Sequence, residues 1–473
     1  MEDAGIVEEL GVLDGLYHSD FSVEFRDGVS CETYGADQFA GLVDQCDDFI
    51  FRRRLVGKVI VLAARPSPQQ IAMIIALIRR GIVFALTNPS SQENAVASIL
   101  SDERYEGTGL VVVSLDERGF DCAAMAIGQE KRGEGDVLCL ATTSGTTGTP
   151  KVVEFTKSAL KLSLNGVLSV TGRPVWSSRV LLAQSVEFDG FFEELFCVLE
   201  CGGTAIIPLH AVGSRPDFLL SCLDEWRITC IDLPTAVFNT FGTYLAGRQA
   251  NGFASRMCGG VTFVIGGQRF LPPAVEAIGK VFPNASVVNT YGPTEATITC
   301  AAAVIWAHGA WRASGQLIGW TYPGVNSKLI YDGRQMSESG VLVLGGCAVE
   351  GAPAASLSVE DGAAWLDTGD LVSVSERGYV FERRKGGFIK VGGRRVDLAA
   401  VRAELEDVTG TMVRPEPAVS ARGLDHLRIL VVRSPDCADS HLVRALRRSP
   451  SLLGVPTEID LVDRLGLSEV GKG

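Results

Sequence analysis

The sequence predicts an α/β fold, in which a large N-terminal domain of mixed and parallel sheets layered with helices is joined by a hinge to a small α+β domain. Two observations predict this fold. Short apolar runs alternate with amphipathic runs over the first ~380 residues, which favours strands and helices in alternation. Near residue 385 the composition becomes basic and rich in Gly, which is typical of a joint between two domains.

The expected elements follow the chain in order. Residues 58–64 form an apolar run, residues 68–81 carry a helical pattern, and residues 82–89 form the next apolar run, so we expect strand, helix and strand. The joint at 382–397 divides the chain into an expected large domain, 1–385, and a small mobile domain, 386–473; a surface hairpin within one domain is the alternative. Further buried strands are expected at 109–115, 136–144, 179–185, 203–209, 228–234 and 260–267.

Composition excludes several functional classes. The 473 residues are 46% hydrophobic and carry a net charge of −13, which argues against nucleic-acid partners and against docking on anionic membranes. The N-terminal residues lack the basic segment of a signal peptide, and Arg65 and Arg79 interrupt the most apolar region before it could span a bilayer. The scattered cysteines favour reduced thiols. These features suit a cytoplasmic enzyme.

The stretch TTSGTTGTPK, from Thr142 to Lys151, indicates an anion site. It follows an expected buried strand and offers several hydroxyls and unencumbered backbone N–H groups, while Gly allows the backbone to approach phosphate oxygens. Lys151 adds a cation. The spacing of Gly145, Gly148 and Lys151 differs from that of the Walker loop, so the sequence predicts a phosphate loop of another type.

This loop resembles the phosphate loop of the acyl-adenylate-forming superfamily, which includes acyl-CoA ligases, luciferases and the adenylation domains of nonribosomal peptide synthetases. Other motifs of that superfamily follow in the right order. NTYGPTEAT (289–297) resembles the adenine and magnesium motif, and WLDTGDL (365–371) the ribose motif. RRKGGFIKVGGRRVDLAAVRAELE (383–406) resembles the hinge and the start of the small domain, and the terminal VGKG resembles the catalytic lysine motif. The resemblance covers nearly the whole chain.

The resemblance implies a reaction and a set of residues. A carboxylate attacks the α-phosphorus of ATP and pyrophosphate leaves, so the site needs cations and oriented donors. Glu295 would hold Mg²⁺, Thr294 would bond the α-phosphate, and Lys472 would bridge the two reacting anions. The implied nucleotide-binding residues are Thr143, Ser144, Gly145, Thr146, Thr147, Gly148, Lys151, Gly267, Asn289, Tyr291, Asp370 and Arg384, and the implied hinge residues are Lys385 and Gly386.

Two motifs depart from the family pattern. At the hinge, Gly386 stands where the family usually has Asp or Lys, so Gly would supply the backbone rotation. Before the terminal lysine, Gly466 stands where the family usually has Pro, so the assignment of Lys472 depends on Gly471-Lys472 and on its position.

The substrate pocket is inferred by spacing from these motifs. In amino-acid-activating members an FD pair supplies a carboxylate for the substrate ammonium, and Asp189 matches it. Two further carboxylates, Glu193 and Asp232, require a second positive charge, which favours lysine, β-lysine or ornithine as the substrate. β-Lysine comes first because the pocket residues resemble those of β-lysine-activating members. Gly190 and Gly266 are expected to leave room for the chain; the alternative is that Glu193 points away. The pocket residues are Asp189, Gly190, Glu193, Asp232, Val264, Gly266, Thr290, Ile298 and Thr299.

Three functions remain open from the sequence. The first is an amino-acid adenylating enzyme that loads a carrier protein; because no GxxS segment follows Lys472, it is expected to act in trans or to be an excised domain. The second is an acyl-CoA ligase, which Asp189 and the acidic pocket disfavour. The third is an inactive adenylate-binding protein, which the intact phosphate loop, Glu295 and Lys472 disfavour. A small MbtH-like helper protein is a further possible partner.

Overall fold

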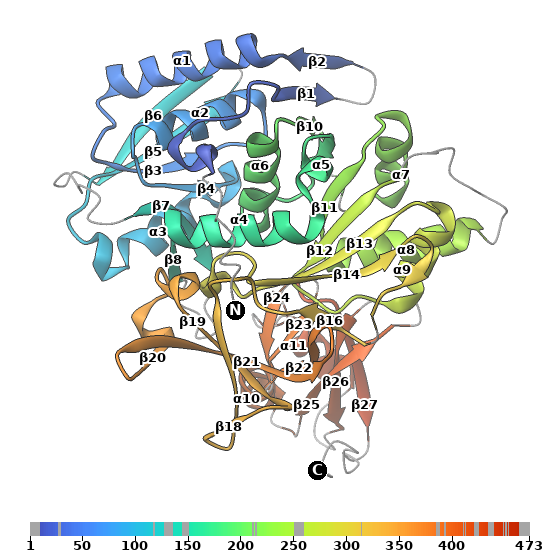
Figure 1. Ribbon diagram of the computed structural model, residues 1–473. Helices are drawn as coiled ribbons and strands as arrows, with labels where there is room; N and C mark the ends of the chain where they lie inside the picture. The colour runs from blue at the N-terminus through green and yellow to red at the C-terminus, as the bar shows by residue number, and fades with distance from the viewer. Residues whose placement is uncertain are drawn as a thin grey trace. The chain divides into compact units, whose positions relative to one another are not determined.

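The computed structural model divides into two compact units, Met1–Glu382 and Arg383–Gly473, and each is described here by itself (Figure 1). The described residues are 10–26, 30–116, 119–126, 136–143, 151–210, 212, 215–249, 260–313, 315–384, 388–391, 394–409, 411, 413–420, 425–433, 439–447, 449, 452 and 454–462.

A nine-stranded sheet forms the centre of the first unit. Its six inner strands, from β13 to β1 in the order below, pair in parallel, and antiparallel strands extend it at both edges. In spatial order the strands are β15 (Ala310–Trp311), β14 (Ala301–Ala307), β13 (Ser286–Tyr291), β12 (Thr262–Gly266), β11 (Cys230–Pro234), β9 (Arg179–Leu181), β10 (Thr204–Pro208), β1 (Ser22–Arg26) and β2 (Cys31–Tyr34).

A six-stranded sheet forms the second layer of strands. Its four inner strands are parallel, and an antiparallel strand closes each edge. In spatial order they are β6 (Gly119–Ala126), β5 (Leu110–Asp116), β3 (Val59–Ala63), β4 (Phe84–Thr87), β7 (Val137–Thr143) and β8 (Lys151–Thr156).

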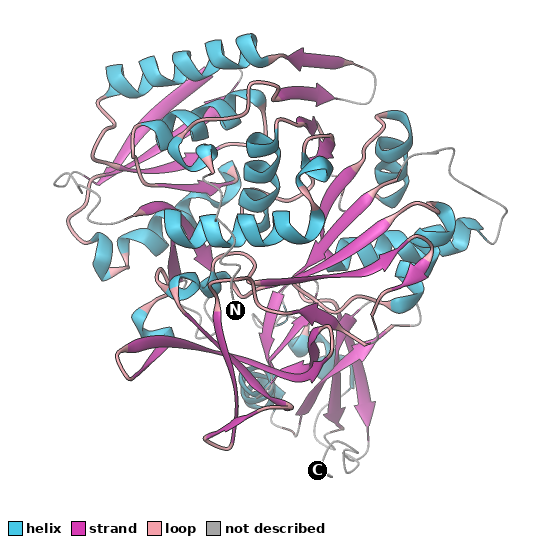
Figure 2. Cartoon of the chain, in the orientation of Figure 1, coloured by secondary structure: helices cyan, strands magenta, loops and turns pink. Residues whose placement is uncertain are grey.

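Helices cover both faces of these sheets (Figure 2). One hydrophobic core unites α1, α2, α4 and α6 with residues of both sheets, so these helices lie between the sheets. A second core joins α7, α8 and α9 to the opposite face of the nine-stranded sheet, and α3 covers the outer face of the six-stranded sheet. The helices are α1 (Ala36–Arg53), α2 (Pro68–Arg79), α3 (Gln92–Leu100), α4 (Lys157–Thr171), α5 (Arg173–Trp176), α6 (Gly190–Cys201), α7 (Pro216–Glu225), α8 (Thr235–Gln249) and α9 (Pro272–Val281).

An antiparallel sheet follows within the first unit, and its last strand, β22, runs across the division between the units. Short 3-10 turns connect many of the elements of this unit: η1 (Gly11–Asp14), η2 (Pro89–Ser91), η3 (Glu103–Tyr105), η4 (Thr294–Ala296), η5 (Cys347–Val349) and η6 (Ala354–Ser356). The strands of the sheet are β16 (Leu317–Gly319), β22 (Gly378–Arg384), β21 (Ala363–Ser375), β19 (Ser339–Gly345), β17 (Asn326–Tyr331) and β18 (Arg334–Met336), with β20 (Leu357–Glu360) paired to β21.

The second unit is a small α+β structure with its own apolar core, which includes Val401, Leu405, Ile429 and Leu446. Two strands form one hairpin, and a three-stranded sheet combines an antiparallel with a parallel pair. Its elements are β23 (Phe388–Val391), β24 (Arg394–Asp397), α10 (Leu398–Thr409), β25 (Val413–Val419), β26 (Asp425–Val432), α11 (Asp439–Leu446) and β27 (Thr457–Val462).

The predicted fold class is confirmed. The expected strand, helix and strand at 58–64, 68–81 and 82–89 correspond to β3, α2 and β4. Helix α2 begins where Ser67 accepts the Gln70 N–H at 3.1 Å and Pro68 occupies its first turn. Among the described residues, no helix combines the length and hydropathy that crossing a bilayer requires.

Candidate active site

The alternation of side chains along β11 and β12 determines which face of the sheet carries Asp232. We use the name acid pocket for Glu193, Glu194 and Asp232 together with the side chains that contact them. Cys230 and Val264 belong to the core that α6 fills, whereas Ile231 and Ile265 belong to the core on the α8 and α9 side. Successive side chains of a strand point to opposite faces. Asp232 therefore shares the face of Cys230 and is directed towards α6.

Glu193 on α6 is buried, with an exposed fraction of 1%, and accepts a hydrogen bond from one member of a cluster of hydroxyls. Thr299 Oγ1 donates to Glu193 Oε2 and accepts from Tyr322, whose hydroxyl lies 3.4 Å away. Ser163 Oγ lies 3.2 Å from Thr299 Oγ1 and accepts the Thr299 N–H at 3.4 Å. Thr299, in the segment after β13, therefore holds one carboxylate oxygen of Glu193, and Ser163 of α4 holds Thr299 in turn.

Glu194, the next residue of α6, holds the segment that leads into the helix. Its two carboxylate oxygens accept the backbone N–H groups of Ala183 and Gln184, each at 3.1 Å. The Gln184 side chain continues the connection, because its Nε2 donates to Asp232 Oδ1 at 3.1 Å. Glu194 is fully buried and Asp232 is 4% exposed, so this network lies inside the protein.

The three buried carboxyls share an unfavourable environment for negative charge. Burial, aided by the neighbouring Asp189, raises the pKa of Asp232 to about 7, against the hydrogen bond from Gln184. Burial and the nearby Asp232 raise the pKa values of Glu193 and Glu194 well above the usual range. Among the described residues, no Lys, Arg or His forms an ion pair with these three groups.

Asp189 lies at the edge of this cluster, as the N-cap of α6. Its carboxylate accepts the N–H of Gly190 at 3.0 Å, and the residue is half-buried. This combines the helix-capping role with a position beside the buried carboxyls, whose pKa values it helps to raise.

The two pocket glycines have a different role from the one expected. A Cβ at Gly190 would lie 2.9 Å from Gln184 Nε2, and a Cβ at Gly266 would lie 2.5 Å from Thr290 Oγ1. The Thr290 hydroxyl donates to the Ile265 carbonyl at 3.0 Å. The space beside these glycines therefore holds the protein's own side chains, which corrects the expectation that both leave room for a substrate chain.

The remaining expected pocket residues surround the same region. Val264 is buried in β12, and Thr290 is buried at the carboxyl end of β13. Ile298 is buried in the core shared with α6 and has φ 63°, a conformation rare for a β-branched residue. This backbone conformation follows η4 and precedes Thr299, which contacts Glu193.

Two of the expected nucleotide residues of the first unit, Tyr291 and Asp370, meet at the end of β13. The Tyr291 hydroxyl donates to Asp370 Oδ2 at 2.7 Å, and the Asp370 N–H donates to Thr368 Oγ1 at 3.0 Å. Burial, together with Asp370, raises the pKa of Tyr291 far above its usual range, so its hydroxyl remains a donor. Asn289 Nδ2 donates to the Leu317 carbonyl at 2.8 Å, and its buried Oδ1 has no hydrogen-bond partner in the described part of the chain.

Other expected residues are only partly described. Thr294 and Glu295 lie in η4 and are half-buried. The backbone of Thr143 at the end of β7 pairs with Lys151 at the start of β8, and Gly267 directly follows β12 with φ 89°. Arg384 belongs to the second unit. The following expected residues lie outside the described residues: Ser144, Gly145, Thr146, Thr147, Gly148, Lys385, Gly386 and Lys472.

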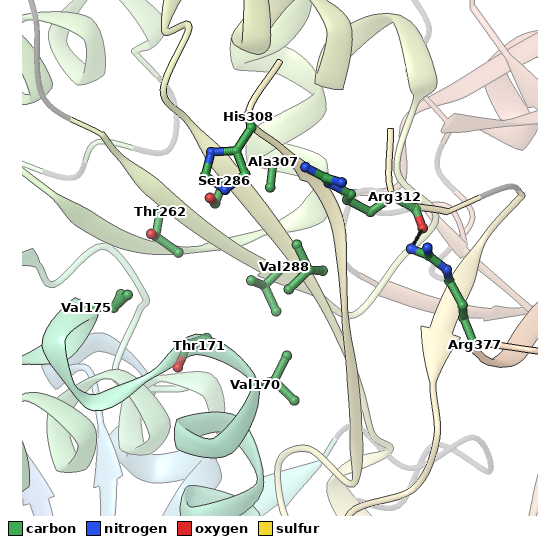
Figure 3. Close-up of a pocket in the computed structure, with 11 residues that line it drawn as sticks. Val170, Thr171, Val175, Thr262, Ser286, Val288, Ala307, His308, Arg312 and Arg377 are labelled. Atoms are coloured by element: carbon green, nitrogen blue, oxygen red, sulfur yellow. Dashed lines mark hydrogen bonds between the residues drawn. The ribbon is translucent and has the colours of Figure 1, made fainter. Parts of the chain in front are cut away.

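A cavity of about 480 Å³ lies elsewhere in the first unit (Figure 3). Thr262 and Ser286 begin β12 and β13, so the cavity is at the amino ends of these parallel strands, opposite the end that carries Gly266 and Tyr291. Figure 3 also shows Arg377 bonded to the Arg312 carbonyl. The cavity contains none of the expected site residues. Ligands of open α/β sheets bind at the carboxyl ends of the strands, so we assign no part of the site to it.

Comparison with known proteins identifies the family. A large layered α/β unit is followed along the chain by a small α+β unit, as in solved structures of the same fold. Residues 104–351, a little over half of the chain, match the family described as AMP-binding enzyme, and the chain belongs to this family. Within it, the chain is similar to adenylate-forming ligases of the nonribosomal peptide synthetase type.

Three curated relatives illustrate the similarity. The isonitrile lipopeptide synthase of Streptomyces coeruleorubidus is 28% identical over 443 residues, covering 88% of this chain and 29% of that protein. The D-alanine–D-alanyl carrier protein ligase of Staphylococcus epidermidis is 24% identical over 374 residues, 74% of this chain and 73% of that protein. The delta-poly-L-ornithine synthetase of Acinetobacter baumannii is 25% identical over 351 residues, 68% of this chain and 24% of that protein. The chain spans less than a third of the first and third relatives.

Solved structures support the fold. The amide bond synthetase McbA from Marinactinospora thermotolerans has a TM-score of 0.71 at 20% identity, covering 98% of this chain and 96% of that chain. NpsA-ThdA from Klebsiella oxytoca, an artificially fused adenylation–PCP di-domain, has a TM-score of 0.67 at 16% identity, covering 96% of this chain and 92% of that chain.

The sequence interpretation missed four residues of the acid pocket. Gln184, Glu194, Ser163 and Tyr322 contact the expected carboxylates or their partners, yet they lie in no family motif that we used. Glu194 carries one available signal, because a second carboxylate in the apolar helix FFEELFCVL requires its own donors. The side-chain partners of Asp232 and Thr299 are distant in sequence and carry no such signal.

Proposed function

We propose that this chain activates a diamino acid with ATP, forming aminoacyl-AMP and pyrophosphate, and transfers the aminoacyl group to the phosphopantetheine thiol of a carrier protein. The observation that carries the substrate class is the burial of Glu193 and Asp232 beside Asp189, without an ion pair to a described cation. Buried charge is costly unless paired. A substrate with two ammonium groups supplies both partners.

The proposed roles divide the substrate into two parts. Asp189 binds the amine nearer the reacting carboxylate, and Glu193 and Asp232 bind the distal ammonium. The contacts support this division, because Asp189 caps α6 at the edge of the cluster while the other two carboxyls are buried. The reacting carboxylate then approaches the nucleotide end, where Lys472 offsets the charge of the two anions.

Tyr291 and Asp370 are proposed to bind the adenine and the ribose, and Asn289 lies beside the adenine edge. Asn289 fits this role because its buried Oδ1 has no hydrogen-bond partner among the described residues. Thr294 binds the α-phosphate, and the 143–151 loop binds the leaving phosphates.

Glu295 is the residue proposed to hold Mg²⁺. The described residues contain no cluster of three or more His, Cys, Asp or Glu side chains suited to a metal. A half-buried Glu295 alone still fits, because Mg²⁺ in such sites binds one or two carboxylates together with substrate phosphates and water. When bound, the ion would offset charge on the phosphates.

The relatives support the substrate class to different extents. The name of one relative refers to poly-L-ornithine, a polymer of a diamino acid. Another relative is named for D-alanine, which has one amine, and for a carrier protein. We propose β-lysine ahead of lysine and ornithine on the resemblance of the pocket residues. A carrier protein, and possible assistance from an MbtH-like protein, complete the proposed partners.

Amino-acid-dependent exchange of pyrophosphate into ATP tests the proposal with β-lysine, lysine, ornithine, norleucine, leucine and glutamate. Two buried charge-assisted hydrogen bonds, each worth roughly 1.5–3 kcal/mol, predict a 10²–10⁴-fold preference in kcat/KM for a diamino acid over norleucine. Glu193→Gln combined with Asp232→Asn should remove most of this preference and preserve KM for ATP. A matched control is Glu187→Gln, an exposed carboxylate of the same segment. The highest kcat/KM with leucine or glutamate would contradict the diamino assignment.

A further inference from the structure

Gln184 connects the backbone before α6 to the acid pocket. Its N–H and that of Ala183 are bound by Glu194, so both oxygens of a fully buried carboxylate fix this short segment. The segment lies between β9 and α6, and its position sets the position of the Gln184 side chain. A side chain held at its own backbone loses little further freedom when it binds a ligand.

The amide of Gln184 has a defined orientation. Nε2 faces Asp232 and donates to its Oδ1 at 3.1 Å. Oε1 is consequently the other end of the amide and lies 3.5 Å from the position of a Cβ on Gly190. None of the described residues donates a hydrogen bond to Gln184 Oε1. The absence of a side chain at Gly190 allows the amide to lie there.

A primary ammonium has three N–H donors and needs three acceptors when it is buried. Asp232 has one carboxylate oxygen bonded to Gln184 and Glu193 has one bonded to Thr299, which leaves Asp232 Oδ2 and Glu193 Oε1 as acceptors. Gln184 Oε1 is a third acceptor connected to the same network. These three oxygens are enough to accept the three N–H donors of a primary ammonium.

We propose that Gln184 is a further specificity-determining residue, whose Nε2 holds Asp232 in place while Oε1 accepts the third N–H of the substrate's distal ammonium. This inference rests on the proposed diamino substrate and adds that the distal nitrogen is an unsubstituted primary amine. The neutral amide is essential to it, because a Lys or Arg at this position would neutralise Asp232 and remove the need for a second substrate charge.

The test compares Gln184→Met, which preserves side-chain length and removes both hydrogen bonds, with Glu187→Gln in the same segment. In pyrophosphate exchange we expect Gln184→Met to raise KM for the preferred diamino acid about tenfold to a hundredfold, with KM for ATP unchanged. The wild type should discriminate by a similar factor against the same acid with its distal amine dimethylated, and Gln184→Met should lose most of this discrimination. Glu187→Gln should behave as the wild type.

A pH profile separates recognition from a merely structural role. The hydrogen bond from Gln184 opposes the rise in the pKa of Asp232, so Gln184→Met should move the pH dependence of KM to higher pH. Gln184→Lys should lower the preference for diamino over neutral acids. A diamino preference in the wild type that Gln184→Met leaves unchanged, with the variant folded by circular dichroism, would overturn this inference alone. A wild type that prefers a neutral acid would instead overturn the proposed function.

Discussion

The candidate site has a nucleotide end, with Tyr291 and Asp370, and an acid end, with Glu193, Glu194 and Asp232. The polar groups of the two ends find hydrogen-bond partners in different ways. At the nucleotide end Asp370 accepts from Tyr291, and its environment raises the pKa of the phenol, which therefore remains a donor. At the acid end, Glu193, Glu194 and Asp232 are buried together, and hydroxyl and amide donors only partly offset their burial. The Tyr291–Asp370 pair is satisfied without a ligand, although Asn289 Oδ1 beside it has no partner among the described residues, whereas the buried carboxyls of the acid end gain most from a cationic ligand. Binding at the acid end is therefore expected to be the more dependent on charge and pH.

The largest effect on activity is expected from Lys472, which is proposed to offset the charge of the two reacting anions. Lys472→Ala should lower adenylation about 10²-fold or more, because one cation that offsets transition-state charge is lost. Transfer of a preformed aminoacyl-adenylate to the carrier thiol should change far less. Pyrophosphate exchange measures the first reaction and thioester formation the second. Near-normal exchange would remove Lys472 from the mechanism.

The next effect concerns the proposed movement between the two half-reactions. Gly386→Pro fixes φ near −65°, so we expect one half-reaction to fall about tenfold or more while the other persists. Gly386→Ala is the matched control, since it changes the residue without fixing φ. Equal retention of both half-reactions in the Pro variant would show that the pivot lies elsewhere.

Stability should depend on pH through the acid end. The pKa of Asp232 is raised to about 7, against about 3.9 in an unfolded chain, so the folded protein binds the additional proton. Its contribution to the free energy of unfolding is complete below about pH 4 and is lost as pH rises to about 7, with a limiting slope of about 1.4 kcal/mol per pH unit. Asp232→Asn should reduce the slope measured by urea unfolding between pH 4 and 7, while Glu193 and Glu194, whose pKa values are also raised, contribute the rest. An unchanged slope would place the titration elsewhere.

Glu194→Gln tests the support of the segment before α6. A Gln side chain has one acceptor oxygen for two backbone N–H groups, so one N–H loses its partner. We expect the free energy of unfolding to fall by about 1–3 kcal/mol and KM for the amino acid to rise. Urea unfolding at fixed pH measures the first effect, with Glu187→Gln as the control. A Gln variant as stable as the wild type would contradict this role.

The smallest effect is expected at the nucleotide end. Tyr291→Phe removes one donor to Asp370, worth about 0.5–1.5 kcal/mol, so KM for ATP should rise about two- to tenfold. KM for the amino acid should not change. If Tyr291→Phe alters amino-acid selectivity instead, the two ends are coupled and the comparison above fails.

Much of the fold was predictable because its physical signals are local. The apolar runs of β3 and β11 and the helical pattern of α2 each arise from a few adjacent residues. The motifs also singled out Tyr291 and Asp370 as expected nucleotide residues, although the hydrogen bond that joins them was not predictable from their spacing.

The acid end was only partly predictable. Spacing gave Glu193 and Asp232, but the hydrogen bond from Gln184 to Asp232 joins residues 48 positions apart. The contact of Thr299 with Ser163 joins residues 136 positions apart. The role of Gly190 was misread for the same reason, since only the folded chain shows that the Gln184 amide occupies the adjacent space. Partners of buried polar groups depend on tertiary packing, which local patterns do not encode.

The adjacent residues Glu193 and Glu194 have separate roles. One role could therefore change by substitution while the other is retained. Glu194 binds backbone groups alone, so its requirement is the same whatever acid is activated. Glu193 accepts from the Thr299 hydroxyl and lies near Asp232, so in the proposed pocket its requirement would depend on the ligand. A lineage could therefore replace Glu193, Asp232 and Gln184 to acquire a new substrate while Glu194 kept the helix start intact. Adjacent positions in one turn of α6 would then allow the substrate preference to change while the backbone before the helix is kept.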